Sequence, residues 1–437
     1  MSTQAIAIRE SKSAKASDFH AAFIVAWAFC LLFYFMEYAV RSAPSVMLPE
    51  LTSAFGLSTT GLSSLIGLYY YTYAIFAVIA GASVDRWGGK YTVPFGVLLL
   101  AVGTAMFALG GEGTAAVGRL LQGAGAAYAF VAAVYLAAHG LPARYLATAI
   151  GITQCIGMLG GSAGQFVTAP LIHGPIAWEE LWIYAGLVTL LIAVAMFVVT
   201  PREKEPAAPQ SAASQAGLWS TFAPYKVVLT NPQSYLCGLI GGLLFLPTTV
   251  GAMTWGVSFL EHGWHVDYAQ AVDRAAMVAI GWVFGCPILG YVADRIGRRK
   301  PVIFAGSALM LVAALAIYYL PPETFPPYLL AFLLGFGSGA AMIPYSTIKE
   351  VNPDHAKGSA TGAMNFIVFV LSALLAPAYG WWLQKLANSG PLTEDVFAKA
   401  GSVFVAAIVI ALIATVFLRE TGSAGREANQ ALHAPRA

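Results

Sequence analysis

The segment Gly81-Ala-Ser-Val-Asp-Arg-Trp-Gly-Gly-Lys90 has a close copy later in the chain, Gly290-Tyr-Val-Ala-Asp-Arg-Ile-Gly-Arg-Arg-Lys300. Both contain the pattern G-x-x-x-D-R-x-G, and the second copy begins 209 residues after the first in a chain of 437 residues. Each copy lies between the second and third long apolar runs of its half. The sequence therefore predicts a parallel internal repeat of about half the chain.

Composition places the chain in a membrane. Only 10% of the residues are charged, whereas about 25% is usual for a soluble domain. Hydrophobic residues make up 58% and the mean hydropathy is +0.71. These values exclude a soluble enzyme and a disordered chain, and the net charge of only +2 excludes a basic nucleic-acid binder. The four cysteines lie in apolar runs and are predicted to pack as small hydrophobic residues: Cys30, Cys155, Cys237 and Cys286.

Twelve runs are long and apolar enough to cross a bilayer as helices. They cover residues 20–48, 57–84, 91–110, 114–140, 146–171, 178–200, 229–260, 270–293, 301–320, 326–348, 358–385 and 397–418. The predicted organisation is an all-α membrane protein with a tail (1–19), a six-helix bundle (20–200), a linker (201–228), a second six-helix bundle (229–418) and a tail (419–437).

The positions of Lys and Arg predict the orientation. With both termini in the cytoplasm, 18 of the 23 Lys and Arg residues lie on the cytoplasmic side. Only Arg274, Lys385 and Lys399 lie outside, and Arg41 and Arg119 fall within predicted helices. This bias predicts cytoplasmic termini. The compact loops and short tails favour a bacterial inner membrane.

The repeated loop resembles the signature loop of the major facilitator superfamily, and the resemblance covers nearly the whole chain. A second match is Arg119-Leu-Leu-Gln-Gly-Ala-Gly125, which is similar to the R-x-x-Q-G-x-G element of span four. The resemblance implies two six-helix bundles, transport by alternating access, a monomer and loops that act as a cytoplasmic gate. The predicted gate residues are Gly81, Asp85, Arg86, Gly88, Lys90, Gly290, Asp294, Arg295, Gly297 and Arg298.

Three charged residues lie clearly inside predicted spans, away from the span ends: Glu37, Arg41 and Arg119. Each costs about 2.5–3.5 kcal/mol near a helix centre on insertion scales, so each needs a reason. Glu37 and Arg41 are four residues apart, on one helix face and roughly 6 Å apart along the axis. One interpretation is that they only neutralise each other, and that Arg119 is purely structural.

The functional interpretation takes the three together. The arrangement is similar to that of organic-anion:proton symporters of the superfamily, which place an acid and an arginine in span one and an arginine in span four. Arg41 and Arg119 are then predicted anion ligands, because guanidinium groups bind carboxylates bidentately and stay charged. Glu37 is the predicted proton carrier. Further predicted substrate contacts, each of which could instead only pack, are Tyr38, Tyr70, Gln122, Gln154, Trp255, Tyr345 and Asn365.

The predicted function is proton-coupled uptake of a small organic anion. Spans seven, eight and eleven hold no obvious charge in their membrane-embedded parts, which favours a monoanionic, zwitterionic or amphipathic substrate over a multiply charged one. The expected partners are this anion, protons and the bilayer, with no nucleic acid. No ATP-binding P-loop occurs and no cofactor is expected, so an ion gradient must drive transport.

Other functions stay open. An exporter of amphipathic compounds or a siderophore carrier is one, although span five lacks the G-P-x-x-G pattern typical of proton-driven exporters. Another is a sensor that no longer moves solute. A membrane enzyme is disfavoured, because the G-x-S-x-G match at Gly160–Gly164 lies in a predicted helix without a histidine base. The histidines of the loop Glu261–Asp267 predict no metal site.

Overall fold

The computed structural model describes residues 20–141, 143–202, 222–326, 328–353, 356–388 and 390–422. The predicted N-terminal tail lies outside these residues, as do most of the predicted linker and most of the C-terminal tail. The described part is helical throughout, and twelve of its helices are long and apolar enough to span a membrane. The predicted fold class is confirmed.

The first half contains six spans and two short helices. The first span is α2 (Ala21–Ser42), which ends in the 3-10 turn η1 (Ala43–Val46), and short helix α3 (Leu48–Phe55) follows it. The other spans are α4 (Thr59–Trp87), α5 (Gly89–Ala108), α6 (Glu112–Gly140), α7 (Ala143–Phe166) and α9 (Trp178–Val199), with α8 (Thr168–Ile172) between the last two.

Short helix α10 (Ala223–Leu229) precedes the second half. Span seven is α11 (Pro232–Leu246), η3 (Pro247–Trp255), α12 (Gly256–Ser258) and η4 (Phe259–Gly263). Spans eight and nine are α13 (Tyr268–Ile296) and α14 (Lys300–Tyr319), followed by the turn η5 (Pro322–Thr324). Span ten is α15 (Leu329–Ser338), η6 (Gly339–Met342) and α16 (Ile343–Glu350), and the last two spans are α17 (Lys357–Ala387) and α18 (Glu394–Phe417).

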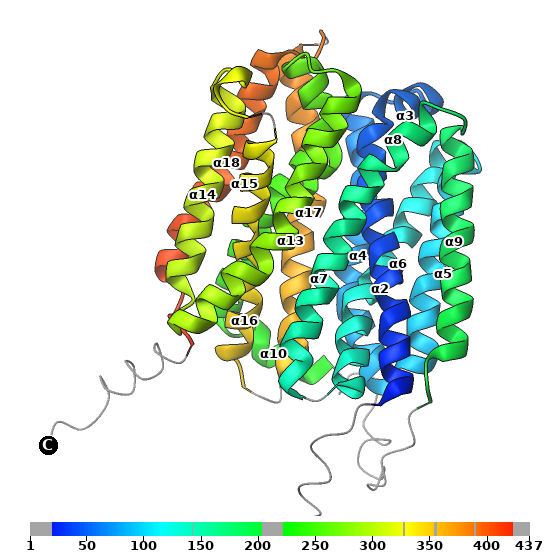
Figure 1. The fold of residues 1–437 in the computed structure, drawn as a ribbon, viewed down its shortest axis with the longest axis vertical. Coiled ribbons are helices and arrows are strands. Elements are labelled where there is room, and N and C mark those ends of the chain that lie inside the picture. Colours follow the sequence, from blue (N-terminus) through cyan, green and yellow to red (C-terminus); the bar gives the residue numbers. More distant parts are fainter. Residues whose placement is uncertain are drawn as a thin grey trace, which may run out of the picture.

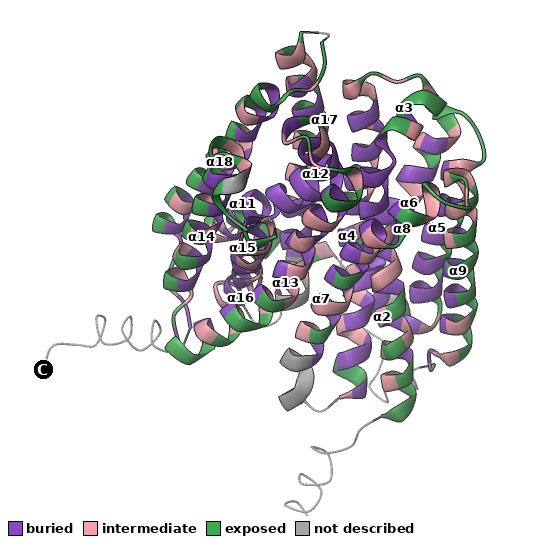
Figure 2. Cartoon of the chain, turned by 45° about the horizontal axis from the view of Figure 1, so that its top comes forward, coloured by how far each residue is buried: buried purple, intermediate pink, exposed green. Residues whose placement is uncertain are grey.

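The helices form two bundles that meet along α7, α13, α4 and α17, near the middle of the view in Figure 1. Direct hydrogen bonds join them: Ser63 Oγ donates to the Ala376 carbonyl (2.6 Å) and Ser162 Oγ to the Ala276 carbonyl (3.1 Å). Buried residues gather between the helices and exposed residues lie on the outer faces (Figure 2). Large apolar side chains among the exposed ones suit contact with lipid, which is as apolar as they are.

Spans seven and ten are interrupted, where the sequence predicted continuous helices. Span seven widens into a π-helix from Pro247 to Trp255. Pro247 has no N–H to give to the preceding turn, so the regular α-helical ladder cannot continue through it. Span ten passes through a 3-10 turn at Gly339–Met342. Irregular backbone at this depth is tolerated where protein or a cavity surrounds it.

Small residues let α7 approach α2 closely. A Cβ at Gly160 would lie 2.1 Å from the Phe35 carbonyl oxygen of α2, which is far inside van der Waals contact. Gly160 belongs to the ridge that also gave the G-x-S-x-G match. The structure places this ridge in a helix packed against another helix, so close packing explains these glycines.

We expect Gly160→Ala to destabilise the protein, because the new methyl group meets backbone that cannot rotate away. Overpacking typically costs about 1–3 kcal/mol, which corresponds to a fall of roughly 5 °C in the melting temperature. Gly151→Ala on the same helix is the control, since a Cβ there meets nothing within 4 Å. Thermal melting in detergent would measure both, and equal melting temperatures would contradict the packing argument.

Candidate functional site

The first bundle holds a buried ion pair close to its boundary with the second bundle. Glu37 and Arg41 of α2 are 0% and 1% exposed, and the Arg41 Nη2 donates to Glu37 Oε1. The Tyr69 hydroxyl of α4 donates to the same carboxylate oxygen, and Arg41 Nε donates to the Tyr69 oxygen at 3.2 Å. Glu37 Oε2 and Arg41 Nη1 have no hydrogen-bond partner among the described residues. The pair therefore keeps one acceptor and one donor available.

Aromatic rings enclose the Arg41 guanidinium. Its central carbon lies 4.2 Å from the ring centre of Tyr38, 5.3 Å from that of Tyr69 and 5.2 Å from that of Tyr73. The fourth ring, at 5.1 Å, is Phe369 of α17 in the other bundle. Ring faces attract cations, so these rings partly replace the water that Arg41 has lost. The cation is thus held by both halves of the molecule.

A small cavity of about 20 Å³ lies on the other side of these rings. Three of the rings that contact Arg41 also line it: Tyr38, Tyr73 and Phe369. A volume of this size holds about one water molecule. The remaining lining residues are Tyr34, Phe130, Gln154, Phe245, Met342, Tyr345 and Asn365. A ligand can therefore reach Arg41 from this cavity only if the rings move.

A cleft of about 550 Å³ leads from the small cavity toward the end of the molecule that carries the repeated loops. Phe130, Gln154, Met342 and Tyr345 line both spaces. Residues near the repeated loop, among them Asp294, line the cleft at its far end.

The opposite end is closed by contacts between the bundles. The Gln165 Nε2 donates to the Ala252 carbonyl at 3.1 Å, and the Tyr268 hydroxyl to the Val46 carbonyl at 2.8 Å. A separate cavity of about 420 Å³ lies on that side.

Polar groups from both bundles face the small cavity. The Tyr34 hydroxyl donates to Gln154 Oε1 at 3.2 Å in the first bundle. In the second bundle the Tyr345 hydroxyl donates to Asn365 Oδ1 at 2.7 Å, and the buried Asn365 Nδ2 has no partner in the part of the chain that the structure describes. The described lining of this cavity carries no charged side chain. Four residues of the predicted substrate list thus lie together here: Tyr38, Gln154, Tyr345 and Asn365.

Arg119 and Gln122 of α6 lie elsewhere. Arg119 Nη1 donates to Gln122 Oε1 (2.6 Å), and Nη2 to the Ile66 carbonyl of α4 (3.2 Å). Gln122 Nε2 in turn donates to the Gly103 carbonyl of α5 (3.1 Å). The guanidinium lies 5.0 Å from the Tyr69 ring centre. These bonds tie α6 to its neighbours, and neither residue lines the small cavity.

Two other predicted contacts also lie away from the small cavity. The Tyr70 hydroxyl is 3.5 Å from the Thr249 carbonyl, at the boundary between the bundles. Trp255 lines the cavity of about 420 Å³ at the closed end. The sequence list omitted Tyr69, Tyr73 and Phe369. The two tyrosines are four residues apart on one face of α4, which is a usable signal, whereas nothing distinguishes Phe369 from an ordinary core phenylalanine.

The first repeated loop turns at Gly88, whose φ of +71° favours glycine. Gly81, earlier in α4, faces the Tyr225 hydroxyl of α10, which would lie 3.5 Å from a Cβ. The Lys90 Nζ donates to the Phe197 carbonyl at the end of α9 (2.6 Å). A cation at a helix C-terminus also suits the helix dipole. The side chains of Asp85 and Arg86 lie outside the described residues.

The second loop turns at Gly297 with a φ of +67°, and the Lys300 Nζ donates to the Val416 carbonyl at the end of α18 (2.8 Å). Lys300 thus repeats the contact of Lys90. Gly290 lines the cleft, the Arg295 Nη1 donates to the Tyr291 hydroxyl (2.9 Å), and Arg298 is exposed.

Arg299, which the list of gate residues omitted, makes the strongest contacts of this loop. It donates to Asp294 Oδ1 (2.5 Å) and to both carboxylate oxygens of Glu350 (2.7 and 3.3 Å). Burial lowers the pKa of the Arg299 guanidinium, but its hydrogen bonds to Glu350 and Asp294 outweigh burial and raise the pKa above its ordinary value. Arg299 therefore joins the loop to the end of α16.

The model of the Major Facilitator Superfamily matches residues 30–377. The chain belongs to this superfamily. It is a multi-pass membrane transporter of small molecules and not an enzyme.

The three relatives described next share 23% to 28% identity with this chain. The cis,cis-muconate transport protein of Acinetobacter baylyi is 24% identical over 88% of this chain and 94% of that protein. The probable sulfoacetate transporter SauU of Cupriavidus necator is 23% identical over 82% and 86%, respectively. A proline/betaine transporter of Salmonella typhimurium is 28% identical, over 46% of this chain and 39% of that protein. Among solved structures, a bacterial homolog of the human lysosomal transporter Spinster, inward-facing and unoccupied, has a TM-score of 0.69 and 16% sequence identity. The match covers 91% of this chain and 96% of that chain.

We expect Arg299→Met to destabilise this superfamily member, because it removes charge-assisted hydrogen bonds from a side chain that is only 13% exposed. Such bonds contribute about 2 kcal/mol, so the melting temperature should fall by roughly 5 °C. The matched control is Arg298→Met, which changes the exposed neighbour. Equal effects of the two substitutions would show that the contact with Asp294 and Glu350 contributes nothing.

Proposed function

We propose that the protein takes up a small organic anion of the carboxylate type together with a proton, by alternating access. The observation that carries this proposal is the buried group of Glu37, Arg41 and Tyr69, separated by aromatic rings from a cavity between the bundles. The names of the muconate and sulfoacetate relatives support the substrate class, since both denote organic anions.

Competition for Arg41 would couple proton to substrate. In the structure Arg41 is neutralised by Glu37. A substrate carboxylate that takes the place of Glu37 at Arg41 would leave Glu37 charged, buried and without its partner, which is strongly unfavourable. Protonation of Glu37 removes that penalty. The anion and the proton therefore bind favourably only together, which is what symport requires.

The rings around Arg41 act as the inner barrier in this mechanism. The cleft of about 550 Å³ brings solute to Phe130, Gln154, Met342 and Tyr345, and the rings of Tyr38, Tyr73 and Phe369 would then part to admit its acidic group. Phe369 belongs to the second bundle, so its displacement links occupancy of Arg41 to the relative position of the bundles. Binding energy can shift the conformational equilibrium only through such a difference in contacts between states.

The rest of the substrate would meet neutral donors. Asn365 Nδ2 is buried and has no partner among the residues that the structure describes, and Tyr345 and Gln154 lie beside the same cavity. We assign these three side chains to substrate binding, together with Tyr38 and Arg41. Arg119 and Gln122 position α4 and α5 in this scheme, because they hydrogen-bond to each other and to carbonyls of those helices.

We also assign both termini to the cytoplasm of a bacterial inner membrane, and a monomer as the working unit. The orientation of the termini rests on the 18 of 23 Lys and Arg residues that would then lie on the cytoplasmic side. The cleft would open to the cytoplasm and the closed end would face outward.

A reporter enzyme that is active only outside the cytoplasm tests this topology. Fused after Arg419, alkaline phosphatase is expected to be inactive in intact cells. Fused in the turn η5, between α14 and α15, it is expected to be active. The reverse pattern of activity would mean that the termini lie outside the cytoplasm. The cleft would then open to the outside, and the proposed direction of transport would be reversed.

Transport is tested with purified protein in liposomes that carry an imposed pH gradient. The panel contains monocarboxylates, dicarboxylates including muconate, sulfonates, proline and betaine. Wild type should accumulate at least one anion, and accumulation should vanish when the gradient is collapsed. Arg41→Ala should lower apparent affinity by roughly 10- to 100-fold, the size of a lost charge-assisted interaction.

Glu37→Gln should separate binding from coupling. The amide imitates the protonated carboxyl, so the variant should still exchange labelled for unlabelled substrate but no longer accumulate it against a gradient. Retained exchange also shows that the variant is folded. Lys399→Gln, at an exposed cation paired with Asp395, is the control and should transport normally.

Accumulation that survives both Glu37→Gln and Arg41→Ala would refute the symport mechanism. It would then favour the alternative function, a proton-driven exporter of amphipathic compounds or a siderophore carrier, which does not need Arg41. If betaine or proline were the only compounds transported, the substrate class would be a zwitterion and not an anion.

A further inference from the structure

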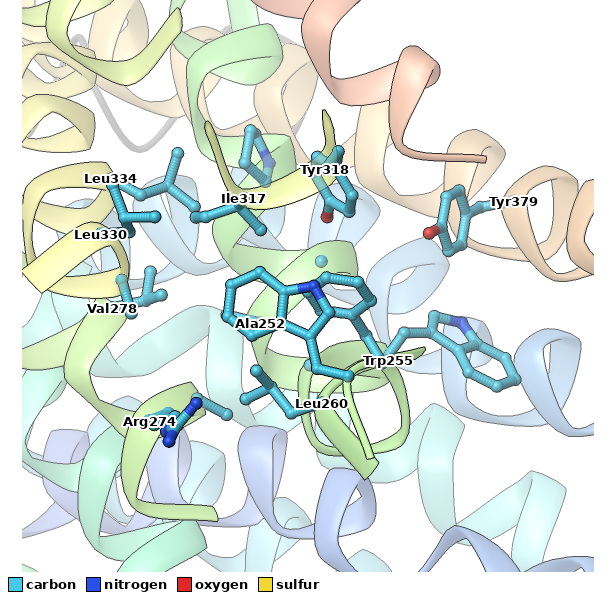
Figure 3. Close-up of a pocket in the computed structure, with 17 residues that line it drawn as sticks. Ala252, Trp255, Leu260, Arg274, Val278, Ile317, Tyr318, Leu330, Leu334 and Tyr379 are labelled. Carbon is cyan, nitrogen blue, oxygen red and sulfur yellow. The ribbon is translucent and has the colours of Figure 1, made fainter. Parts of the chain in front are cut away.

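A second cavity, of about 60 Å³, lies inside the second bundle and away from the central site. It is enclosed by span seven, α13, α14, α15 and α17, and shares no lining residue with the small central cavity. Five aromatic side chains contribute to its lining: Trp255, Phe259, Trp264, Tyr318 and Tyr379. The described lining contains one charged residue, Arg274 (Figure 3).

The cavity lies near the ends of its helices. Arg274 is six residues from the first residue of α13, so it lies about 9 Å into the helix. Tyr318 is in the last turn of α14 and Leu330 in the first turn of α15. A span crosses about 30 Å of hydrocarbon, so these positions lie at or near one membrane interface. Interfaces are where amphipathic molecules place their headgroups.

Arg274 is a cation without an acidic partner in the described part of the chain. Within the described ranges its guanidinium makes one hydrogen bond, from Nη2 to Gln270 Oε1 at 3.3 Å, and the buried Nε makes none. Figure 3 shows Arg274 at one edge of the cavity, with the Tyr318 and Tyr379 rings across from it. The guanidinium of Arg274 therefore has N–H groups available to bind a ligand at the edge of an apolar space.

We propose that this cavity binds an amphipathic anion, whose acidic headgroup pairs with Arg274 and whose apolar body enters the space between the aromatic rings. A volume of about 60 Å³ suits one ring or a few methylene groups rather than a whole lipid. The ligand is then either the upper part of an anionic phospholipid or a small hydrophobic carboxylate. This site is independent of the transport mechanism, since it uses neither Glu37 nor Arg41.

The site adjoins the closed end of the transport route. Trp255 lines this cavity and also the cavity of about 420 Å³ between the bundles. Trp255 belongs to the π-helical part of span seven, where the backbone is least regular. A ligand bound beside this segment therefore contacts the same side chain that faces the route on the closed side.

Quenching of tryptophan fluorescence by brominated ligands tests the proposal in nanodiscs that contain the full-length protein. The lipid probes are brominated phosphatidylglycerol and, as the matched lipid without net charge, brominated phosphatidylcholine. The soluble probes are brominated octanoate and brominated octanol. The quenching of interest is that of Trp264, because this residue lines the cavity. It is obtained as the difference in quenching between the wild type and Trp264→Phe.

We expect at least one anionic probe to quench at concentrations about tenfold lower than its neutral counterpart, the effect of one charge-assisted contact. Arg274→Gln should abolish this preference and Arg274→Lys should keep part of it. Ala331→Phe should block quenching while Arg274 stays in place. Lys385→Gln, at another cation of the same end that lies against Trp381 and Trp382, should behave as wild type.

Preference for the lipid alone would identify a phospholipid as the ligand, and preference for octanoate a soluble carboxylate. Either result supports the site. Equal quenching by charged and neutral probes in wild type would overturn the proposal. A preference for anions that persists in Arg274→Gln would also overturn it, provided that the variant elutes as a single folded species.

Discussion

The buried contact between Glu37 and Arg41 is the constraint around which the first bundle is arranged. Two opposite charges on one helix face cost less in a membrane than either charge alone, but both still need hydrogen-bond partners. Tyr69 supplies one from α4 and the ring of Phe369 covers the guanidinium from the other bundle. Satisfying this pair therefore fixes the positions of three helices. It also places a titratable group where the bundles meet.

A second set of contacts holds each bundle at the end that carries the repeated loops. In both halves a glycine with positive φ ends one helix, and a lysine shortly after it binds a carbonyl at the end of the last span of that bundle. Lys90 does this for α9 and Lys300 for α18. The second half adds Arg299, which binds Asp294 and Glu350. The duplication visible in the sequence is thus a duplication of physical contacts, with one extra cation in the second copy.

The two halves differ most in their span backbones. Spans seven and ten are interrupted by π and 3-10 segments, and both interruptions supply residues that line cavities: Trp255 and Met342. The first bundle carries the buried charges instead. The first bundle thus supplies charged side chains and the second supplies irregular backbone. This combination suits a binding site between two bundles that move relative to each other. It also leaves the second bundle with a cation, Arg274, that no acidic residue in the described ranges neutralises.

Prediction from the sequence succeeded where the signal is local. Twelve apolar runs, a duplicated loop and a pair of charges four residues apart are all visible in one dimension, because hydrophobicity and helix periodicity act on neighbouring residues. Interruptions of spans seven and ten were missed, since Pro247 and Gly339 are compatible with either a kinked or a regular helix until neighbours are known. Phe369 was missed because nothing local distinguishes it.

The sequence by itself determined that this chain spans a membrane twelve times in two related halves, and that Glu37 and Arg41 share a helix face. Only the tertiary structure decided which residues surround that pair. Arg41 faces the rings beside the central cavity, whereas the hydrogen bonds of Arg119 go to backbone carbonyls and Gln122. The physical reason is that a buried arginine satisfies its donors with whatever the neighbouring helices present. Those neighbours are set by packing between segments far apart in the chain.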